Sequence, residues 1–250
     1  MKNKKLQKTI FAGLMVSIGI VLSSVVSISY PPNSTIIRFG IGYLPLIILS
    51  ISLGPKLGFV AAIIQDILGY IVYIWVYGTP SGPFFPGFTL NSILYGVLPG
   101  MIYNLKIKNK NLFLYVNFVF LLLLFAMGIW GIVNIEQIID LIENRLSAGM
   151  QFDSWVIYLL IILGEVGVIA IVAFLYKNRK YDDSSQRIIF SIMLLEILVT
   201  LILTPLWVSI LYKIPFLPQM PLRIIKAPIE IFIYSLLLLR IIKSLQHYKI

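Results

Sequence analysis

Long apolar runs separated by short polar segments dominate this chain of 250 residues. Runs of about 17–25 apolar residues have the length that a helix needs to cross a bilayer. The predicted spans are about residues 9–28, 36–53, 57–77, 88–105, 112–133, 155–176, 188–211 and 222–242. The pattern therefore predicts an all-α, polytopic membrane protein with about eight transmembrane helices in a single transmembrane domain over residues 1–250.

The segment Asn134–Asp153 follows a different pattern. Ile135 and Ile138 repeat at helical spacing, whereas Glu136 and Asp140 are polar. This alternation is typical of an amphipathic helix. We expect a short helix that lies on the membrane surface.

The segment Gly78–Tyr95 interrupts the apolar pattern. Its glycines and prolines oppose a regular helix up to about Gly87, because proline lacks a donor and glycine is conformationally loose. It could form an interfacial turn with an aromatic anchor, or a lid and wall for a flat aromatic ligand. The side chains predicted to face such a ligand are Phe84, Phe85, Phe88, Thr89, Asn91 and Tyr95.

Composition limits the chemistry. The chain is 59% hydrophobic and 12% charged, which is far too apolar for a soluble domain of this length. It has no cysteine and a single histidine, His247, which excludes thiolate catalysis and multi-histidine metal sites. No phosphate-binding loop or hydrolase motif is present, so we expect no enzymatic activity, cofactor or metal. If the chain moves a solute against a gradient, the energy must come from ion coupling or from a partner.

The basic residues are distributed unevenly. The net charge is +10, yet the Lys and Arg residues cluster in short loops rather than in a nucleic-acid-binding patch. Fifteen of the 20 fall on the side of the two termini when eight helices are assumed. The positive-inside rule then places both termini in the cytoplasm and Gly78–Tyr95 outside the cell membrane.

Several charged residues fall within or at the ends of apolar runs, where an ionisable group is costly. Arg38, Arg223 and Lys226 belong to the outer ends of their predicted helices. They either form a cationic rim for an anionic ligand or extend to the lipid headgroups. Roles for the acidic residues in these runs stay open, although a structural role is favoured for Asp66. The unassigned acidic residues are Asp66, Glu165 and Glu196.

Six short motifs occur in a specific order. They are GIGYLP at 40–45, LGPKLG at 53–58, QDILG at 65–69, PFFPGFTL at 83–90, WVSILY at 207–212 and PLRIIK at 221–226. Together they resemble the substrate-binding (S) components of energy-coupling-factor vitamin transporters, the folate branch above all. The resemblance covers about residues 6–106 and 187–243, and residues 112–176 would be a two-helix insertion into the six-helix core.

The resemblance implies a membrane-embedded subunit that binds a vitamin, folate or a related pterin above all, outside the cell. A transmembrane coupling subunit and two ATPases would then deliver it. The pterin would stack on the aromatic residues of Gly78–Tyr95, and Trp207, Arg38, Arg223 and Lys226 would complete the site. Small residues on the first helix would dock the coupling subunit, because they permit close approach. The docking residues would be Ala12, Gly13 and Ser17.

Other functions stay open. The chain could be an S component for another vitamin or heterocycle, or a stand-alone secondary carrier, although a carrier should show inverted repeats. An integral-membrane enzyme acting on lipids would need a cluster of acids or a metal motif. A structural membrane adaptor would use the extra helix pair.

The charge bias predicts a topology that cysteine labelling can test. In this cysteine-free chain, Ser81→Cys should react with an impermeant thiol reagent in intact cells, and Ser184→Cys should react only after permeabilisation. The reverse labelling pattern would overturn the orientation.

Overall fold

The computed structural model describes residues 2–25, 28–30, 37–78, 83–107, 111–146, 154–178 and 183–247. This part of the chain is helical, apart from the paired strands β1 (Ile28–Tyr30) and β2 (Ile37–Phe39). Within it, five helices are long and apolar enough to cross a membrane. The prediction of an all-α polytopic membrane protein is therefore confirmed. Contacts group the chain into two compact units.

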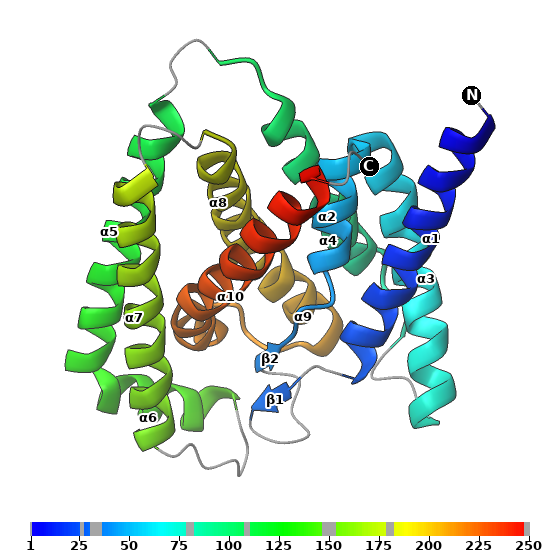
Figure 1. Cartoon of the computed structure of the whole chain (residues 1–250). Coiled ribbons are helices and arrows are strands. Elements are labelled where there is room, and N and C mark those ends of the chain that lie inside the picture. The colour runs from blue at the N-terminus through cyan, green and yellow to red at the C-terminus, as the bar shows by residue number, and fades with distance from the viewer. Residues whose placement is uncertain are drawn as a thin grey trace. The chain divides into compact units, whose positions relative to one another are not determined.

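Unit 1 comprises residues 1–28, 40–105 and 238–250. Its complete helices are α1 (Lys2–Val25), α2 (Leu44–Leu53), α3 (Pro55–Tyr77) and α4 (Pro86–Asn104), coloured blue to green in Figure 1. A tight turn joins α2 to α3, where Gly54 adopts a φ of 96° and Pro55 opens the next helix. Helix α2 is the most deeply buried, since Leu46, Ile47 and Leu49 have no exposed surface.

Small residues let the helices of unit 1 approach closely. A Cβ atom added to Gly58 of α3 would collide with the Gly96 carbonyl oxygen of α4, and the reverse holds for Gly96. Between α2 and α4, the Gly100 N–H donates to Ser50 Oγ at 3.0 Å. These contacts explain why short apolar helices pack here despite weak amphipathicity.

Unit 2 comprises residues 29–39 and 106–237. Its helices are α5 (Leu112–Val133), α6 (Ile135–Leu146), α7 (Ser154–Asn178), α8 (Asp183–Leu195), the π-helix η1 (Glu196–Leu203), α9 (Thr204–Tyr212), the 3₁₀ turn η2 (Leu217–Gln219) and α10 (Met220–His247). The end of α10, from Leu238 onward, belongs to unit 1. Unit 2 thus combines the predicted insertion with residues 29–39 and 187–237 of the predicted core.

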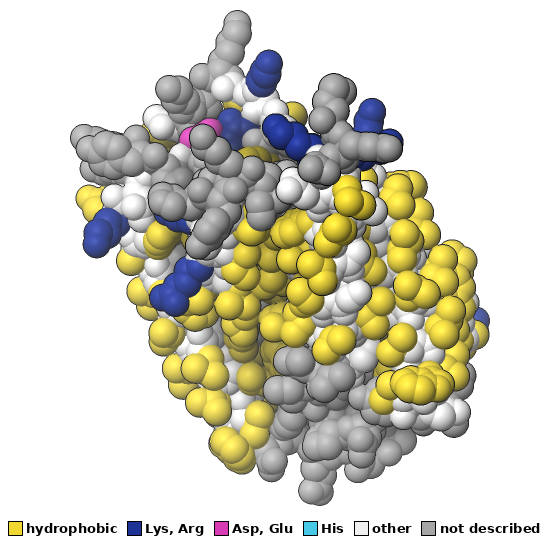
Figure 2. Space-filling model, turned by 45° about the vertical axis from the view of Figure 1, so that its right-hand side comes forward, with side chains coloured by type: hydrophobic (Ala, Val, Ile, Leu, Met, Phe, Trp, Pro, Cys, Tyr) yellow, Lys and Arg dark blue, Asp and Glu magenta, His cyan; other side chains and the backbone are white. Residues whose placement is uncertain are grey.

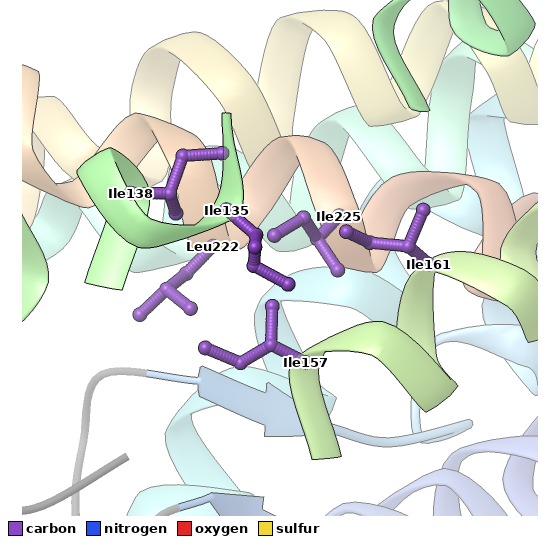
Figure 3. Close-up of a cluster of buried hydrophobic side chains, with 6 residues drawn as sticks. All are labelled: Ile135, Ile138, Ile157, Ile161, Leu222 and Ile225. Carbon is purple, nitrogen blue, oxygen red and sulfur yellow. The ribbon is translucent and has the colours of Figure 1, made fainter. Parts of the chain in front are cut away.

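The amphipathic helix α6 packs on protein. Figure 3 shows its apolar residues meeting those of α7 and α10, all almost fully buried. The cluster consists of Ile135, Ile138, Ile157, Ile161, Leu222 and Ile225. The structure confirms a helix over Ile135–Leu146, and among its described side chains Ile135 and Ile138 are covered within unit 2 rather than exposed to a membrane surface.

Two predicted boundaries were wrong. The predicted span at 36–53 begins as strand β2, and its helix starts only at Leu44, after Gly40 and Gly42 disfavour a helix. The predicted span at 188–211 falls within one continuous helical stretch, Asp183–Tyr212, which changes helical type at Glu196. Helix α4 starts at Pro86, a residue suited to the first helical position, although we expected no helix before Phe88. Residues 31–36 and 79–82, including Ser81, lie outside the described residues.

The surface is suited to lipid. Large apolar side chains are widely exposed, among them Trp75 at 85% and Leu122 at 69%. Figure 2 shows one face covered mainly by hydrophobic side chains. A soluble monomer rarely exposes apolar patches of this extent. The helices and this surface together define a multi-pass membrane protein.

The close approach of α3 and α4 predicts a stability difference between two glycines of the same helix. Gly58→Ala should lower the unfolding free energy by roughly 1–3 kcal/mol, because the added methyl group overpacks the interface. A methyl group added to Gly69 would enter open space, so Gly69→Ala should be neutral or slightly stabilising. Thermal unfolding in detergent would compare the two variants. Equal melting temperatures would contradict this packing of α3 on α4.

Candidate functional site

The predicted ligand-contacting residues divide between the units, as an aromatic group and a cationic group. Phe84, Phe85, Phe88, Thr89, Asn91 and Tyr95 belong to unit 1, and Arg38, Trp207, Arg223 and Lys226 to unit 2. Each group has its own surroundings within its unit.

The aromatic residues precede and begin α4 in unit 1. Phe85 and Phe88 meet edge to face, with ring centroids 6.0 Å apart. Phe84 meets the edge of Tyr70 at 5.5 Å and remains 44% exposed. Such edge contacts hold the rings at fixed angles. Phe84 consequently offers the most open aromatic surface of the six.

Asn91 and Tyr95 lie inside unit 1 rather than on an open surface. Asn91 is 2% exposed and Tyr95 6%. The Tyr95 ring stacks on Tyr43, with centroids 4.3 Å apart and planes at 3°. Tyr95 thus packs α4 against the segment that leads into α2.

Asp66, whose role the sequence left open, joins two helices. Its carboxylate on α3 accepts hydrogen bonds from the Thr89 hydroxyl at 2.6 Å and the Ser92 hydroxyl at 3.2 Å, both on α4. The preference for a structural role is consistent with these two bonds. Thr89 was predicted to contact the ligand. In the structure its hydroxyl donates a hydrogen bond to Asp66.

Arg223 is the central cation of unit 2. It lies in the first turn of α10 and is only 7% exposed. Nη1 donates to the Thr200 carbonyl at 3.4 Å, and Nη2 donates to Gln219 Oε1 at 3.3 Å, while Nε has no hydrogen-bond partner in the described part of the chain. The Gln219 amide is itself fixed by donating to the carbonyls of Ile214 and Pro215. The guanidinium is thus held by neutral acceptors, with no described carboxylate in ion-pair contact.

The π-helix explains why the Thr200 carbonyl is available. The Thr204 N–H donates to Val199, five residues back, instead of to Thr200. The next residue, Pro205, has no N–H to give. Thr200 therefore lacks a helical donor in either register, and Arg223 supplies one. π-bulges of this kind are frequent at functional sites.

Lys226 and two glutamates extend this polar group. Lys226 Nζ lies 3.1 Å from Glu230 Oε2 and 5.8 Å from the centre of the Phe39 ring. Glu196, 3% exposed, accepts a hydrogen bond from the Thr200 hydroxyl and interacts electrostatically with Lys226 and Glu230. Its second carboxylate oxygen, Oε2, has no partner. We call Glu196, Thr200, Gln219, Arg223, Lys226 and Glu230 the buried polar network.

The remaining predicted residues of unit 2 are less informative. Trp207 is half-buried in α9, and Arg38 falls in β2 with its side chain outside the described residues. Thr200 and Gln219 were missed by sequence reasoning. A signal was present, since Thr204-Pro205 marks a break in the helix and Pro218 and Pro221 bracket Gln219.

The predicted docking residues lie on α1. Gly13 and Ser17 are exposed, Ala12 is half-buried, and the Ser17 hydroxyl donates to the Gly13 carbonyl at 3.0 Å. No atom lies within 4 Å of a methyl position built on Gly13. This stretch of α1 is therefore open within unit 1.

The fold and the buried network define the class: a multi-pass α-helical membrane protein with a cation held inside unit 2. No protein-family model matches the chain. The chain is 32% identical over 129 residues to the "Folate transporter FolT" of Clostridium novyi (strain NT). That match covers 51% of this chain and 69% of the relative. The chain belongs to the family of this folate transporter.

Proposed function

We propose that this chain is the substrate-capture subunit of a folate-type transporter, and that it binds folate or a related pterin from outside the cell. The observation that carries the proposal is its 32% identity to the clostridial folate transporter. The motifs GIGYLP, QDILG, PFFPGFTL and PLRIIK add the resemblance to S components of energy-coupling-factor transporters.

The anionic part of the ligand is assigned to Arg223. Folates carry carboxylates, and a planar guanidinium can hold a carboxylate through two parallel hydrogen bonds. Arg223 has an Nε without a hydrogen-bond partner and no ion pair among the described residues, and its place in the first turn of α10 adds the positive end of a helix dipole. Lys226, Arg38 and Trp207 are proposed as further contacts from unit 2.

The ring is assigned to the aromatic residues of unit 1. Phe84 is the most exposed of the three phenylalanines. Phe85 and Phe88, which follow it in the sequence, meet edge to face. Aromatic faces are favourable partners for a flat heterocycle. Thr89, Asn91 and Tyr95 are proposed to support this wall through the packing of α4.

Energy is assigned to partner subunits, because the sequence carries no nucleotide-binding loop. We propose a transmembrane coupling subunit and two ATPases. The coupling subunit would dock on the face of α1 that carries Ala12, Gly13 and Ser17. The exposure of Gly13 and Ser17 supports this assignment.

The assignment of Arg223 predicts a charge-dependent loss of affinity. A charge-assisted contact contributes about 1.5–3 kcal/mol. Arg223→Ala should therefore weaken folic acid binding roughly 10- to 150-fold, since 1.4 kcal/mol corresponds to a tenfold change. Arg223→Lys should recover only part of the loss, because the planar fork is absent. Titration calorimetry on the purified protein would measure these affinities.

Two controls separate recognition from folding. The diamide of folic acid has neutral groups in place of both glutamate carboxylates, so wild type and Arg223→Ala should bind it alike. Arg240→Ala removes an exposed arginine of the same helix and should leave both affinities unchanged. An Arg223→Ala penalty of equal size for folic acid and its diamide would refute the carboxylate contact.

The docking assignment predicts a separation of binding from uptake. The double variant Gly13→Leu/Ser17→Leu should fold and bind folic acid, because these positions are exposed. It should lose co-purification with the coupling subunit and lose uptake in cells. Gly69→Leu, at another open glycine, serves as the control and should retain both. Unchanged uptake in the double variant would place the docking face elsewhere.

A further inference from the structure

Two buried atoms of the network have no hydrogen-bond partner among the described residues. They are the donor Arg223 Nε and the acceptor Glu196 Oε2. Both residues are more than nine-tenths buried. Thr200 contacts both of them, since its hydroxyl donates to Glu196 and its carbonyl accepts from Arg223. Glu230 also interacts electrostatically with both.

Among the described residues, only two of the four charged side chains of the network form an ion pair. Lys226 is matched to Glu230 by the 3.1 Å ion pair. Arg223 is held only by the neutral acceptors Thr200 and Gln219, and Glu196 is in no described ion pair. With all four groups charged, the network is neutral overall. An anion arriving at Arg223 would then leave one uncompensated negative charge in a buried setting.

We propose that Glu196 is a proton-binding site, and that its protonation is linked to the binding of an anionic ligand at Arg223. The inference deepens the proposed function and rests on it, since the ligand supplies the anionic carboxylate. In the protonated state, Glu196 is neutral and the network carries a net charge of +1, which complements that carboxylate. One proton from water accompanies each anion that binds when Glu196 is ionised beforehand.

Physical reasons favour Glu196 over the other acids as the proton acceptor. An uncompensated buried charge is strongly unfavourable, and a buried carboxyl group avoids it by taking up a proton. The described charged groups acting on Glu196 are Lys226 and Glu230, both from α10. Glu230 already has an ion-pair partner in Lys226, whereas Glu196 has none among the described residues. Glu196 has only the Thr200 hydroxyl as a hydrogen-bond partner among the described residues.

The pH dependence of folic acid binding tests the linkage. Wild-type affinity should fall as the pH rises through the titration of Glu196, with a limiting slope of about tenfold per pH unit for one linked proton. Glu196→Gln reproduces the neutral state. Its affinity should vary much less with pH and should exceed that of wild type at alkaline pH. Calorimetry in two buffers of different ionisation enthalpy would count the protons taken up.

Matched variants isolate Glu196 from other titrations. Glu165→Gln changes another acidic residue of unit 2 outside the network and should keep the wild-type pH profile. Because the same folic acid is used throughout, titration of the ligand affects all proteins equally. Thr200→Val removes the hydroxyl that stabilises the ionised carboxylate, and should move the loss of affinity to more alkaline pH. This variant also tests the proposal if Glu196→Gln fails to fold.

The outcomes separate a failure of the proton linkage from a failure of the proposed function. If wild type binds folic acid with no proton uptake and no difference from Glu196→Gln at any pH, the linkage is refuted while the proposed function stands. A pH profile that is the same in Glu196→Gln and wild type also refutes it. If wild type binds no folic acid at any pH, the proposed function and the linkage both fail.

Discussion

The hydrogen bond from Arg223 to the Thr200 carbonyl organises the polar interior of unit 2. Inside a membrane protein each backbone polar group needs a partner within the protein. Pro205 and the π-helical register leave the Thr200 carbonyl without a helical donor. Arg223 Nη1 donates a hydrogen bond to this carbonyl oxygen instead, at 3.4 Å. Gln219 holds the other end of the guanidinium from η2. The position of the cation therefore follows from a backbone irregularity rather than from a carboxylate partner.

In unit 1, two adjacent polar residues of α3 form hydrogen bonds to other segments of the unit. Gln65 of α3 donates to the Gly42 carbonyl at 3.0 Å, and Gly19 of α1 leaves room for its side chain. The next residue, Asp66, accepts the two hydroxyl hydrogen bonds from α4. These two neighbouring residues thus connect α3 to the segment before α2 and to α4. This arrangement fixes the start of α4, where the aromatic residues lie.

Sequence periodicity was sufficient for the long helices, because lipid exposure demands continuous apolar runs. The predicted span at 112–133 coincides with α5, and that at 155–176 is extended by only a few residues in α7. Periodicity could not show that 37–39 form a strand, since a short apolar run suits either structure. It also could not assign Asp66 or Glu196. Their roles depend on Thr89, Ser92 and Thr200, and apolar patterning does not specify which of these hydroxyls meets which acid.

Helices α6 and α7, which lie in the predicted insertion, pack against the cationic turns of α10. Helix α7 approaches α10 through small residues, because a Cβ on Gly164 would lie 3.1 Å from Pro228 and one on Gly167 only 2.8 Å from Phe232. One turn further along, the cluster in Figure 3 packs α6 and α7 against Leu222 and Ile225. These residues each adjoin a cation, Arg223 or Lys226, in sequence. A change in the packing of α6 or α7 would therefore displace the backbone that holds both cations. Helices α6 and α7 thus pack directly against the stretch of α10 that carries Arg223 and Lys226 of the buried polar network.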